Sequence, residues 1–200
     1  MSSEVKANKV SPATGTDFTF GDSGDTFTVP SGATLAVTGA TVTGLSAGKV
    51  LQVLSTAKTN TFSRTASSGD YGDVTGLTVA ITPSSTSNKI LVMVSLSCGG
   101  TGGQEMRYKI VRDSTDIFIG DAADSQGRGS GAGRSNNGST QEVLTGIYLD
   151  SPSSTSALTY KIQIGGEGSV AYRVNWCIDD ADNNTITRTA SSITVMEIEG

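Results

Sequence analysis

The residues with the clearest potential for chemistry lie in the stretch DDADNNT, near the end of the chain. Asp180, Asp182 and Asn184 occupy the first, third and fifth positions of an EF-hand-like calcium loop, whose side-chain oxygens would bind the cation. The sixth position is Thr185 instead of glycine, and the twelfth is Ser191 instead of glutamate. An acidic surface loop is therefore favoured, with calcium binding as the alternative.

The chain contains no histidine, which excludes Ser-His-Asp and Cys-His catalysis together with imidazole metal ligands. A glycosidase needs two carboxylates that face each other across a cleft, and the spacing of Glu105, Glu142 and Glu167 identifies no such pair. The stretch GRGSGAG lacks the Gly-Lys-Ser/Thr ending of a phosphate-binding loop. We therefore predict that the protein is not an enzyme, and we assign no catalytic, cofactor-binding or metal-binding residues.

Five other residues have both a chemical and a structural interpretation. Asp22 and Asp25 in GDSGD are typical of turns, with cation binding between chains as the alternative. Cys98 and Cys177 each follow a strand-like run, and two buried, reduced thiols are favoured over a disulfide because no disulfide framework is present. Trp176 is typical of a core or subunit-interface residue, with sugar stacking as the alternative.

The longest irregular stretch is Asp121–Thr140, DAADSQGRGSGAGRSNNGST. A loop of this length within a compact domain is usually either functional or poorly ordered. A flexible surface loop is favoured. Rigid β scaffolds often carry binding residues on loops, so the alternative is a recognition loop in which Arg128 and Arg134 would contact an anionic glycan.

Composition and periodicity indicate an all-β protein. Charged residues make up 16% of the chain and glycine occurs 25 times, which suits tight turns and a neutral polar surface. Helical spacing of apolar residues is absent, whereas alternation with a period of two is common. In KILVMVSLSC, Ile90–Val94 is apolar on both sides, which predicts a central strand buried on both faces at that end. Three other runs each place one set of residues on a single face: Tyr160, Ile162 and Ile164; Met106, Tyr108 and Ile110; Val143, Ile147 and Leu149.

We expect two domains, residues 1–48 and residues 49–200. From Lys49 onward the chain contains roughly eight to ten strand-like runs, enough for a jelly-roll β-sandwich. Residues 1–48 contain brief β pieces at Phe18–Phe20, Phe27–Val29, Thr34–Val37 and Thr41–Thr43, separated by turns that include Pro30–Gly32. Such pieces bury too little surface to fold alone, so we expect a short β-strand anchor or stalk that packs against other chains.

Several phrases carry a family resemblance. SEVKANKVSPATGTDFTFGDSGDTFTVPSGATLAVTG resembles the opening of tail-fibre and other virion-associated proteins of marine and cyanobacterial tailed phages. YGDVTGLTVAITPSSTSNKILVMVSLS, VRDSTDIFIGDA and TASSITVMEIEG resemble the C-terminal β domain of the same group, whose layout is similar to the trimeric jelly-roll heads of the C1q and tumour-necrosis-factor type. The resemblance covers nearly the whole chain except Asp121–Thr140, and it implies a virion structural protein. Fibres, tail appendages and head decorations share these phrases, and the chain is shorter than most fibres of the group.

Charge and hydropathy restrict the partners. The net charge of −5 at pH 7 argues against binding to duplex DNA or to an anionic membrane, because both need a basic face. The polar start MSSEVKANKV predicts no secretory signal, and the longest apolar run, Ile90–Val94, is too short to span a bilayer. We expect the protein to be assembled into the virion in the host cytoplasm and to leave the cell by lysis.

These observations together predict a homotrimeric virion protein that works by binding. Residues 1–48 would dock on other virion proteins, and exposed loops of the head would face a host-surface glycan or protein, as in a short tail fibre or receptor-binding appendage. The alternative is a capsid decoration or head-fibre protein that contacts only virion proteins. We expect no cofactor, no nucleic acid and no membrane insertion.

Overall fold

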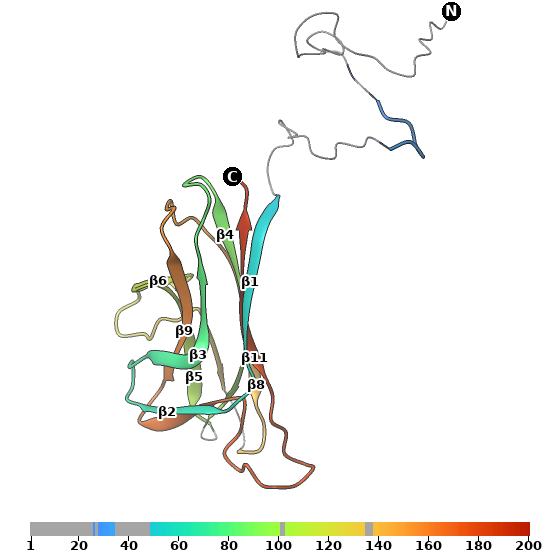
Figure 1. Cartoon of the computed structure of the whole chain (residues 1–200). Coiled ribbons are helices and arrows are strands. Elements are labelled where there is room, and N and C mark those ends of the chain that lie inside the picture. The colour runs from blue at the N-terminus through green and yellow to red at the C-terminus, as the bar shows by residue number, and fades with distance from the viewer. Residues whose placement is uncertain (1–25, 27, 35–48, 101–102, 135–137) are drawn as a thin grey trace, which may run out of the picture. The chain divides into compact units, whose positions relative to one another are not determined.

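The computed structural model describes residues 26, 28–34, 49–100, 103–134 and 138–200. The chain divides into two units, Met1–Leu45 and Ser46–Gly200, and each is described by itself (Figure 1). Among the described residues, no helix has the length and apolarity needed to cross a membrane.

In the first unit, the described residues contain one turn. The amide of Ala33 donates a hydrogen bond of 3.0 Å to the carbonyl of Pro30, and Gly32 has a φ of 84°, which favours glycine. The predicted turn at Pro30–Gly32 is confirmed. The predicted strand Phe27–Val29 is wrong at Thr28 and Val29, neither of which is in a strand. The other predicted β pieces of residues 1–48, together with Asp22 and Asp25, lie outside the described residues.

The second unit is a sandwich of two antiparallel sheets, seen edge-on in Figure 1. The first sheet has the order β1-β11-β4-β10-β2, with β8 on the other edge of β4; the second has the order β3-β9-β5-β6, with β7 also paired to β5. The strands are β1 (Val50–Lys58), β2 (Phe62–Ala66), β3 (Gly72–Ile81), β4 (Lys89–Gly99), β5 (Glu105–Arg112), β6 (Thr115–Ile117), β7 (Gly131–Arg134), β8 (Glu142–Asp150), β9 (Leu158–Gly166), β10 (Val170–Val174) and β11 (Ser191–Ile198).

The strand order has jelly-roll topology, which confirms the predicted fold class. The main strands run β1-β11-β4-β8 in one sheet and β3-β9-β5-β7 in the other, so the chain passes repeatedly from one sheet to the other as in two Greek keys. The short strand β6 completes a hairpin with β5 through a turn at Asp113 and Ser114. Strands β2 and β10 pair with each other and extend the first sheet at one end.

The core lies between the sheets and is built from alternate residues of the strands. In β9, Tyr160, Ile162 and Ile164 are buried, while Thr159 is exposed. In β5, Met106, Tyr108 and Ile110 are likewise buried. The two predicted alternations are therefore confirmed, together with the face that turns inward.

The prediction for the central strand is correct in place and wrong in detail. β4 pairs with β8 along one edge and with β11 and β10 along the other, so it is central. However, Leu91 and Met93 are only partly buried, whereas Leu96–Gly99 is buried at every residue. The end that is buried on both faces is therefore the opposite one, because only there does the Trp176–Cys177 backbone lie close against Gly99 on the strand's other face.

The predicted long loop Asp121–Thr140 is shorter than expected. Gly131–Arg134 forms strand β7, which pairs with Glu105–Tyr108 of β5. The preceding residues are tied to the sheet, since the amide of Ser130 donates to the carbonyl of Tyr108 at 2.8 Å and the Tyr71 hydroxyl donates to the carbonyl of Arg128 at 2.8 Å. Residues 135–137 lie outside the described part. The sequence GAGR did not predict this edge strand, because glycine and alanine have low β propensity and give no alternation of apolar and polar side chains.

A buried carboxylate joins the C-terminal strand to a loop. Glu197 is 1% exposed, and its oxygens accept hydrogen bonds from Gln52 Nε2 (2.5 Å), Asn88 Nδ2 (2.6 Å) and the amide and hydroxyl of Ser84 (2.6 and 2.8 Å). Burial alone would raise the pKa of this carboxyl, but the donated hydrogen bonds outweigh burial and lower the pKa from 4.5 to about 2. The TPSSTSN loop is therefore held by the charge of Glu197.

This carboxylate predicts a loss of stability in acid. A depressed pKa in the folded state stabilises the protein above about pH 4.5, and the contribution, about 3 kcal/mol in the free energy of unfolding, is lost as the pH falls toward 2. Glu197→Gln should destabilise the protein at pH 7 and flatten this pH dependence. Chemical denaturation of both proteins between pH 7 and pH 2 measures the effect, and parallel curves for the two would contradict it.

A second prediction concerns Gly146 in β8. A methyl group at Gly146 would collide with the Tyr108 hydroxyl, which donates to the carbonyl of Thr145 at 2.9 Å in the core. Gly146→Ala should therefore lower the free energy of unfolding by about 1–3 kcal/mol. Gly120→Ala is the matched control, because the added methyl group meets no atom within 4 Å. Equal denaturation midpoints for the two variants would show that β8 does not approach Tyr108 this closely.

Candidate functional site

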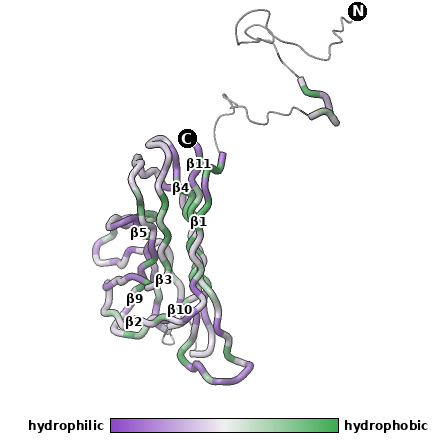
Figure 2. The backbone as a smooth tube through the Cα atoms, in the orientation of Figure 1, coloured by the Kyte–Doolittle hydropathy of each residue, from purple (hydrophilic) through white to green (hydrophobic). Residues whose placement is uncertain are grey.

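The outer face of the first sheet is uncharged over four neighbouring strands, and seven of its twelve aligned residues are apolar. Cross-strand pairing aligns its residues in three rows of four. The rows are Val53-Met196-Leu91-Leu149, Ser55-Thr194-Met93-Ile147 and Ala57-Ser192-Ser95-Thr145. We call these residues the apolar sheet face. Figure 2 shows hydrophobic residues recurring along β1 and β4.

On this face the side chains of β1 and β8 are exposed, whereas those of β4 and β11 are partly buried. Ile147 is 67% exposed, Val53 52% and Leu149 49%, and Val143 extends the same face of β8 at 60%. Isolated exposed apolar residues are ordinary, but a contiguous set without a charge is typical of a contact surface. β1 and β8 lie at the two edges of this four-stranded part, and each pairs with one strand among the described residues. The face can therefore bind another apolar surface, with free strand edges beside it.

Sequence alternation predicted that Val143, Ile147 and Leu149 share a face, which is confirmed, but that face points outward. The inward side of β8 carries Leu144, Gly146, Tyr148 and Asp150. Two contacts fix this choice: Gly146 makes room for Tyr108, and Asp150 pairs with Arg112. The sequence therefore shows that these apolar residues share a face, and only the tertiary contacts reveal that this face is exposed to solvent.

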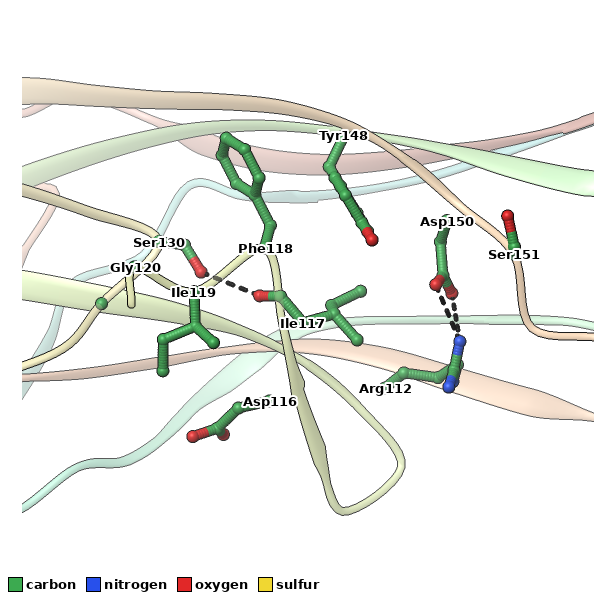
Figure 3. A pocket seen from close by; sticks show the side chains of 11 residues that line it. Arg112, Asp116, Ile117, Phe118, Ile119, Gly120, Ser130, Tyr148, Asp150 and Ser151 are labelled. Atoms are coloured by element: carbon green, nitrogen blue, oxygen red, sulfur yellow. Dashed lines mark hydrogen bonds and ion pairs between the residues drawn. The ribbon is translucent and has the colours of Figure 1, made fainter. Parts of the chain in front are cut away.

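A cavity of about 740 Å³ opens at the edge of the sandwich, between β8 and the residues that follow β6 (Figure 3). One wall carries two aromatic rings, Phe118 and Tyr148, stacked with centroids 5.2 Å apart and planes inclined by 25°. Phe118 is 40% exposed. Arg112, Asp150 and Ser151 lie together at one end, and Ser130 and Asp116 are also in the lining. The cavity therefore combines an aromatic surface with fixed polar groups.

The polar end of the cavity is held by a buried network. Arg112 Nη1 donates to both carboxylate oxygens of Asp150, at 2.8 and 2.6 Å, and the Tyr160 hydroxyl donates to Asp150 Oδ2 at 2.7 Å. The Asp150 side chain is 5% exposed and that of Arg112 is 21% exposed. Burial raises the pKa of Tyr160, and the adjacent carboxylate raises it further, so the hydroxyl stays a donor. Alternation identified Tyr160 as a residue of one strand face, but its contact with Arg112 and Asp150 was not predicted, because the three residues come from three strands.

The two predicted glycan-binding arginines are engaged within the chain. Arg128 Nε donates to the carbonyl of Gly120 at 2.6 Å. Arg134 donates to the carbonyl of Gly103 and forms an ion pair of 2.9 Å with Glu167. The structure does not bring the two guanidinium groups to one site. Arg128 instead lines a smaller cavity of about 270 Å³ with Glu105 and Arg107.

The acidic stretch near the C-terminus forms a surface loop. Asp180 pairs with Arg188, whose Nε and Nη2 donate to the two carboxylate oxygens at 3.0 and 2.7 Å. Asn183 Oδ1 accepts from the amide and hydroxyl of Thr185, and Asp182 is exposed. Within the described residues, no group of three or more Cys, Asp or Glu side chains is placed to hold a metal ion. The carboxylate at the first position of the calcium pattern is thus turned toward an arginine.

Three other predicted residues have structural contacts. Trp176 donates from Nε1 to the carbonyl of Phe62 at 2.9 Å, and the Arg173 guanidinium lies 5.0 Å from the centre of its ring. Cys98 and Cys177 are free and buried, which confirms the thiol prediction. Burial raises the pKa of Cys98 to about 12, so its thiol stays protonated.

The three glutamates considered for glycosidase chemistry are not gathered around one cleft. Glu105 forms an ion pair with Arg107, and Glu167 forms one with Arg134. Glu142 begins β8 and pairs with Cys98 of β4, so it lies in the first sheet. Glu105 begins β5, which belongs to the second sheet. No carboxylate pair across the large cavity is formed by these residues, since none of the three lines it.

Comparisons with known proteins gave structural matches alone. No protein-family model matches the chain, and no curated protein matches it. Among solved structures, the chain is similar to a chain in the structure of the infectious bursal disease virus Gx strain, with 13% sequence identity and a TM-score of 0.38. It is also similar to a mutant VP2 protein of that virus (15%, 0.35) and to its VP2 subviral particle (14%, 0.35). The alignments cover 73–74% of this chain and 36–39% of the viral chains, so this chain spans under two fifths of their length.

The Asp150 network predicts unequal costs for two conservative changes. Asp150→Asn removes the charge that Arg112 faces in a largely buried site, and it should lower the free energy of unfolding by about 2 kcal/mol or more. Tyr160→Phe removes one hydrogen bond and should cost about 1 kcal/mol. Denaturation at pH 7 compares the two variants. A smaller loss for Asp150→Asn than for Tyr160→Phe would contradict the central place of the carboxylate.

Proposed function

We propose that the protein is a structural component of a phage particle and that it works by binding. Copies of the chain associate as a homotrimer through the apolar sheet face, and residues 1–48 attach the trimer to other virion proteins. The assembled heads form a short tail fibre or receptor-binding appendage that faces the host surface. The protein is assembled into the virion in the host cytoplasm, and its role includes no chemical step and no cofactor.

The observation that carries this proposal is the absence of charge on the apolar sheet face. Its three rows contain aliphatic residues, methionine, alanine, serine and threonine. A solvated surface normally mixes charges among such residues, because contiguous apolar patches promote association. A face without charge can pack against a second copy of the chain without leaving a buried ion unpaired. Lys89 borders the face beside Ile198 at one end, as expected for a polar rim.

A closed ring of copies would also cover the free edges of the first sheet. Copies related by a rotation axis cover the apolar face of each subunit and bring the free edges of β1 and β8 near a neighbour. The resemblance of the opening residues and of the head to trimeric virion-associated proteins supports three copies. A trimer also multiplies weak contacts with a host surface through avidity.

Association through this face is tested by adding a charge to it. Ile147→Lys changes a side chain that is 67% exposed, so the subunit should still fold, while the charge should prevent burial of the face between copies. Light scattering should give about 61 kDa for the unchanged protein, three times the 20.4 kDa of one chain, and about 20 kDa for the variant.

The matched control is Ala80→Lys, which adds the same charge to an exposed position in β3 of the other sheet. This variant should stay trimeric. A monomeric unchanged protein, or a trimeric Ile147→Lys variant, would refute assembly through the apolar sheet face. The same measurement on residues 49–200 shows whether the head associates without the first segment.

The role on the particle is tested by adsorption. Labelled trimer should bind saturably to host cells if it forms a receptor-binding appendage. A capsid decoration protein, the alternative, would bind phage heads lacking this protein and would not adsorb to cells. Heads that bind the protein, together with cells that do not, would replace the appendage with the decoration role.

A further inference from the structure

We propose that the cavity between β8 and the residues after β6 binds a neutral saccharide, with Phe118 as the stacking surface and Arg112 as the hydroxyl-binding group. The inference rests on the proposed binding role of the protein and adds the site and the chemical class of its ligand. It does not depend on the number of subunits.

The first argument is the way Phe118 is held. Its φ is 50°, in the left-handed region, which costs a phenylalanine roughly 1–2 kcal/mol. The backbone is fixed on both sides, since Ser130 Oγ donates to the carbonyl of Ile117 at 3.2 Å and Arg128 donates to the carbonyl of Gly120. Ser130 Oγ also accepts from the amide of Ile110 at 2.8 Å. An aromatic side chain that is both strained and exposed is typical of a binding site.

The second argument is the presentation of the aromatic surface. Tyr148 stacks on Phe118 and orients it, while Phe118 lines the cavity and remains 40% exposed (Figure 3). Folding does not use this exposed part of the ring. The carbon–hydrogen face of a pyranose ring packs on such a surface, because the two are flat and of similar width and because the aromatic face is electron-rich.

The third argument is the polar end of the cavity. Arg112 uses Nη1 for both carboxylate oxygens of Asp150 and also interacts with the Tyr160 side chain, and none of the hydrogen bonds described for it is donated by Nε or Nη2. The guanidinium is planar and held by the carboxylate, so its remaining N–H groups have fixed directions. Two neighbouring hydroxyl groups of a sugar match such a pair of donors. Ser151, whose hydroxyl accepts from Lys89 at 2.9 Å, lies at the same end and adds a polar group.

The charges at the cavity favour a neutral ligand. Asp150 balances Arg112, and Asp116 is balanced by Lys109 at 2.6 Å. An anionic sugar or a phosphate would have to approach two carboxylates with no unpaired cation on the lining. The volume of about 740 Å³ lies within the range of small-molecule sites and accommodates one or two sugar rings.

The test uses the full chain and saturation-transfer NMR. The probes are glucose, galactose, mannose, lactose and maltose, with glucuronate and sialic acid as anionic counterparts, each at millimolar concentration. We expect at least one neutral sugar to bind and the acids to bind more weakly. Binding of none of the neutral sugars, or stronger binding of the acids, would overturn the proposal.

Two variants locate the binding. Phe118→Asn removes the ring but keeps a residue that tolerates positive φ, and it should weaken binding at least about tenfold. Arg112→Lys keeps the charge opposite Asp150 and removes the planar donor pair, with a loss in the same direction. Ala132→Asn, at an exposed residue of the smaller cavity, is the control and should bind as the unchanged protein does.

Unchanged affinity in both Phe118→Asn and Arg112→Lys would overturn the assignment of the cavity. Light scattering of the same samples keeps the two proposals separate. A trimer that binds no neutral sugar refutes the saccharide site and leaves assembly standing. A monomer that binds sugar through Phe118 refutes assembly through the apolar sheet face and leaves the site standing.

Discussion

The structure depends on the packing of two antiparallel sheets, which buries one face of each strand and leaves the other face to water or to a partner. In β5 and β9 the distribution is the ordinary one, with apolar residues inside and polar residues outside. In β8 both faces carry apolar residues, and the inward face is the one that holds Tyr148 and Asp150. The apolar sheet face is therefore a consequence of how the core is filled.

Buried polar groups determine where the sandwich is closed and where it stays open. Glu197 fastens the C-terminal strand to the TPSSTSN loop by accepting three hydrogen bonds from Ser84 and Asn88, and it accepts a fourth from Gln52 of β1. At the other edge, Asp150 connects Arg112 of one sheet to β8 of the other. β6 and β8 are not paired with each other, so beside this contact the sheets separate and leave the large cavity. The same carboxylate that stabilises the edge thus supplies the polar end of the candidate saccharide site.

The two candidate surfaces use different parts of the same strand. Ile147 and Leu149 of β8 point outward to the apolar sheet face, whereas Tyr148 and Asp150 point inward to the cavity. Alternation along one strand therefore separates a surface suited to contact between copies from one suited to a small ligand. Because the two surfaces share a rigid element, an assembled head would present its cavities at fixed positions, which is the arrangement that avidity requires.

The sequence by itself determined the all-β class and the alternating core residues of β5 and β9, because local period-two patterns and turn residues encode them. It also indicated two reduced thiols, because two cysteines form no disulfide framework. The number of strand-like runs in the sequence also indicated a jelly roll. The tertiary structure decided which face of β8 is buried, that Gly131–Arg134 is an edge strand, and that Arg112, Phe118 and Asp150 meet at one cavity. These features come from contacts between residues that are distant in the chain, and no local pattern specifies them. Arg128 and Arg134, close in sequence, are separated because each arginine is bound by a different backbone carbonyl.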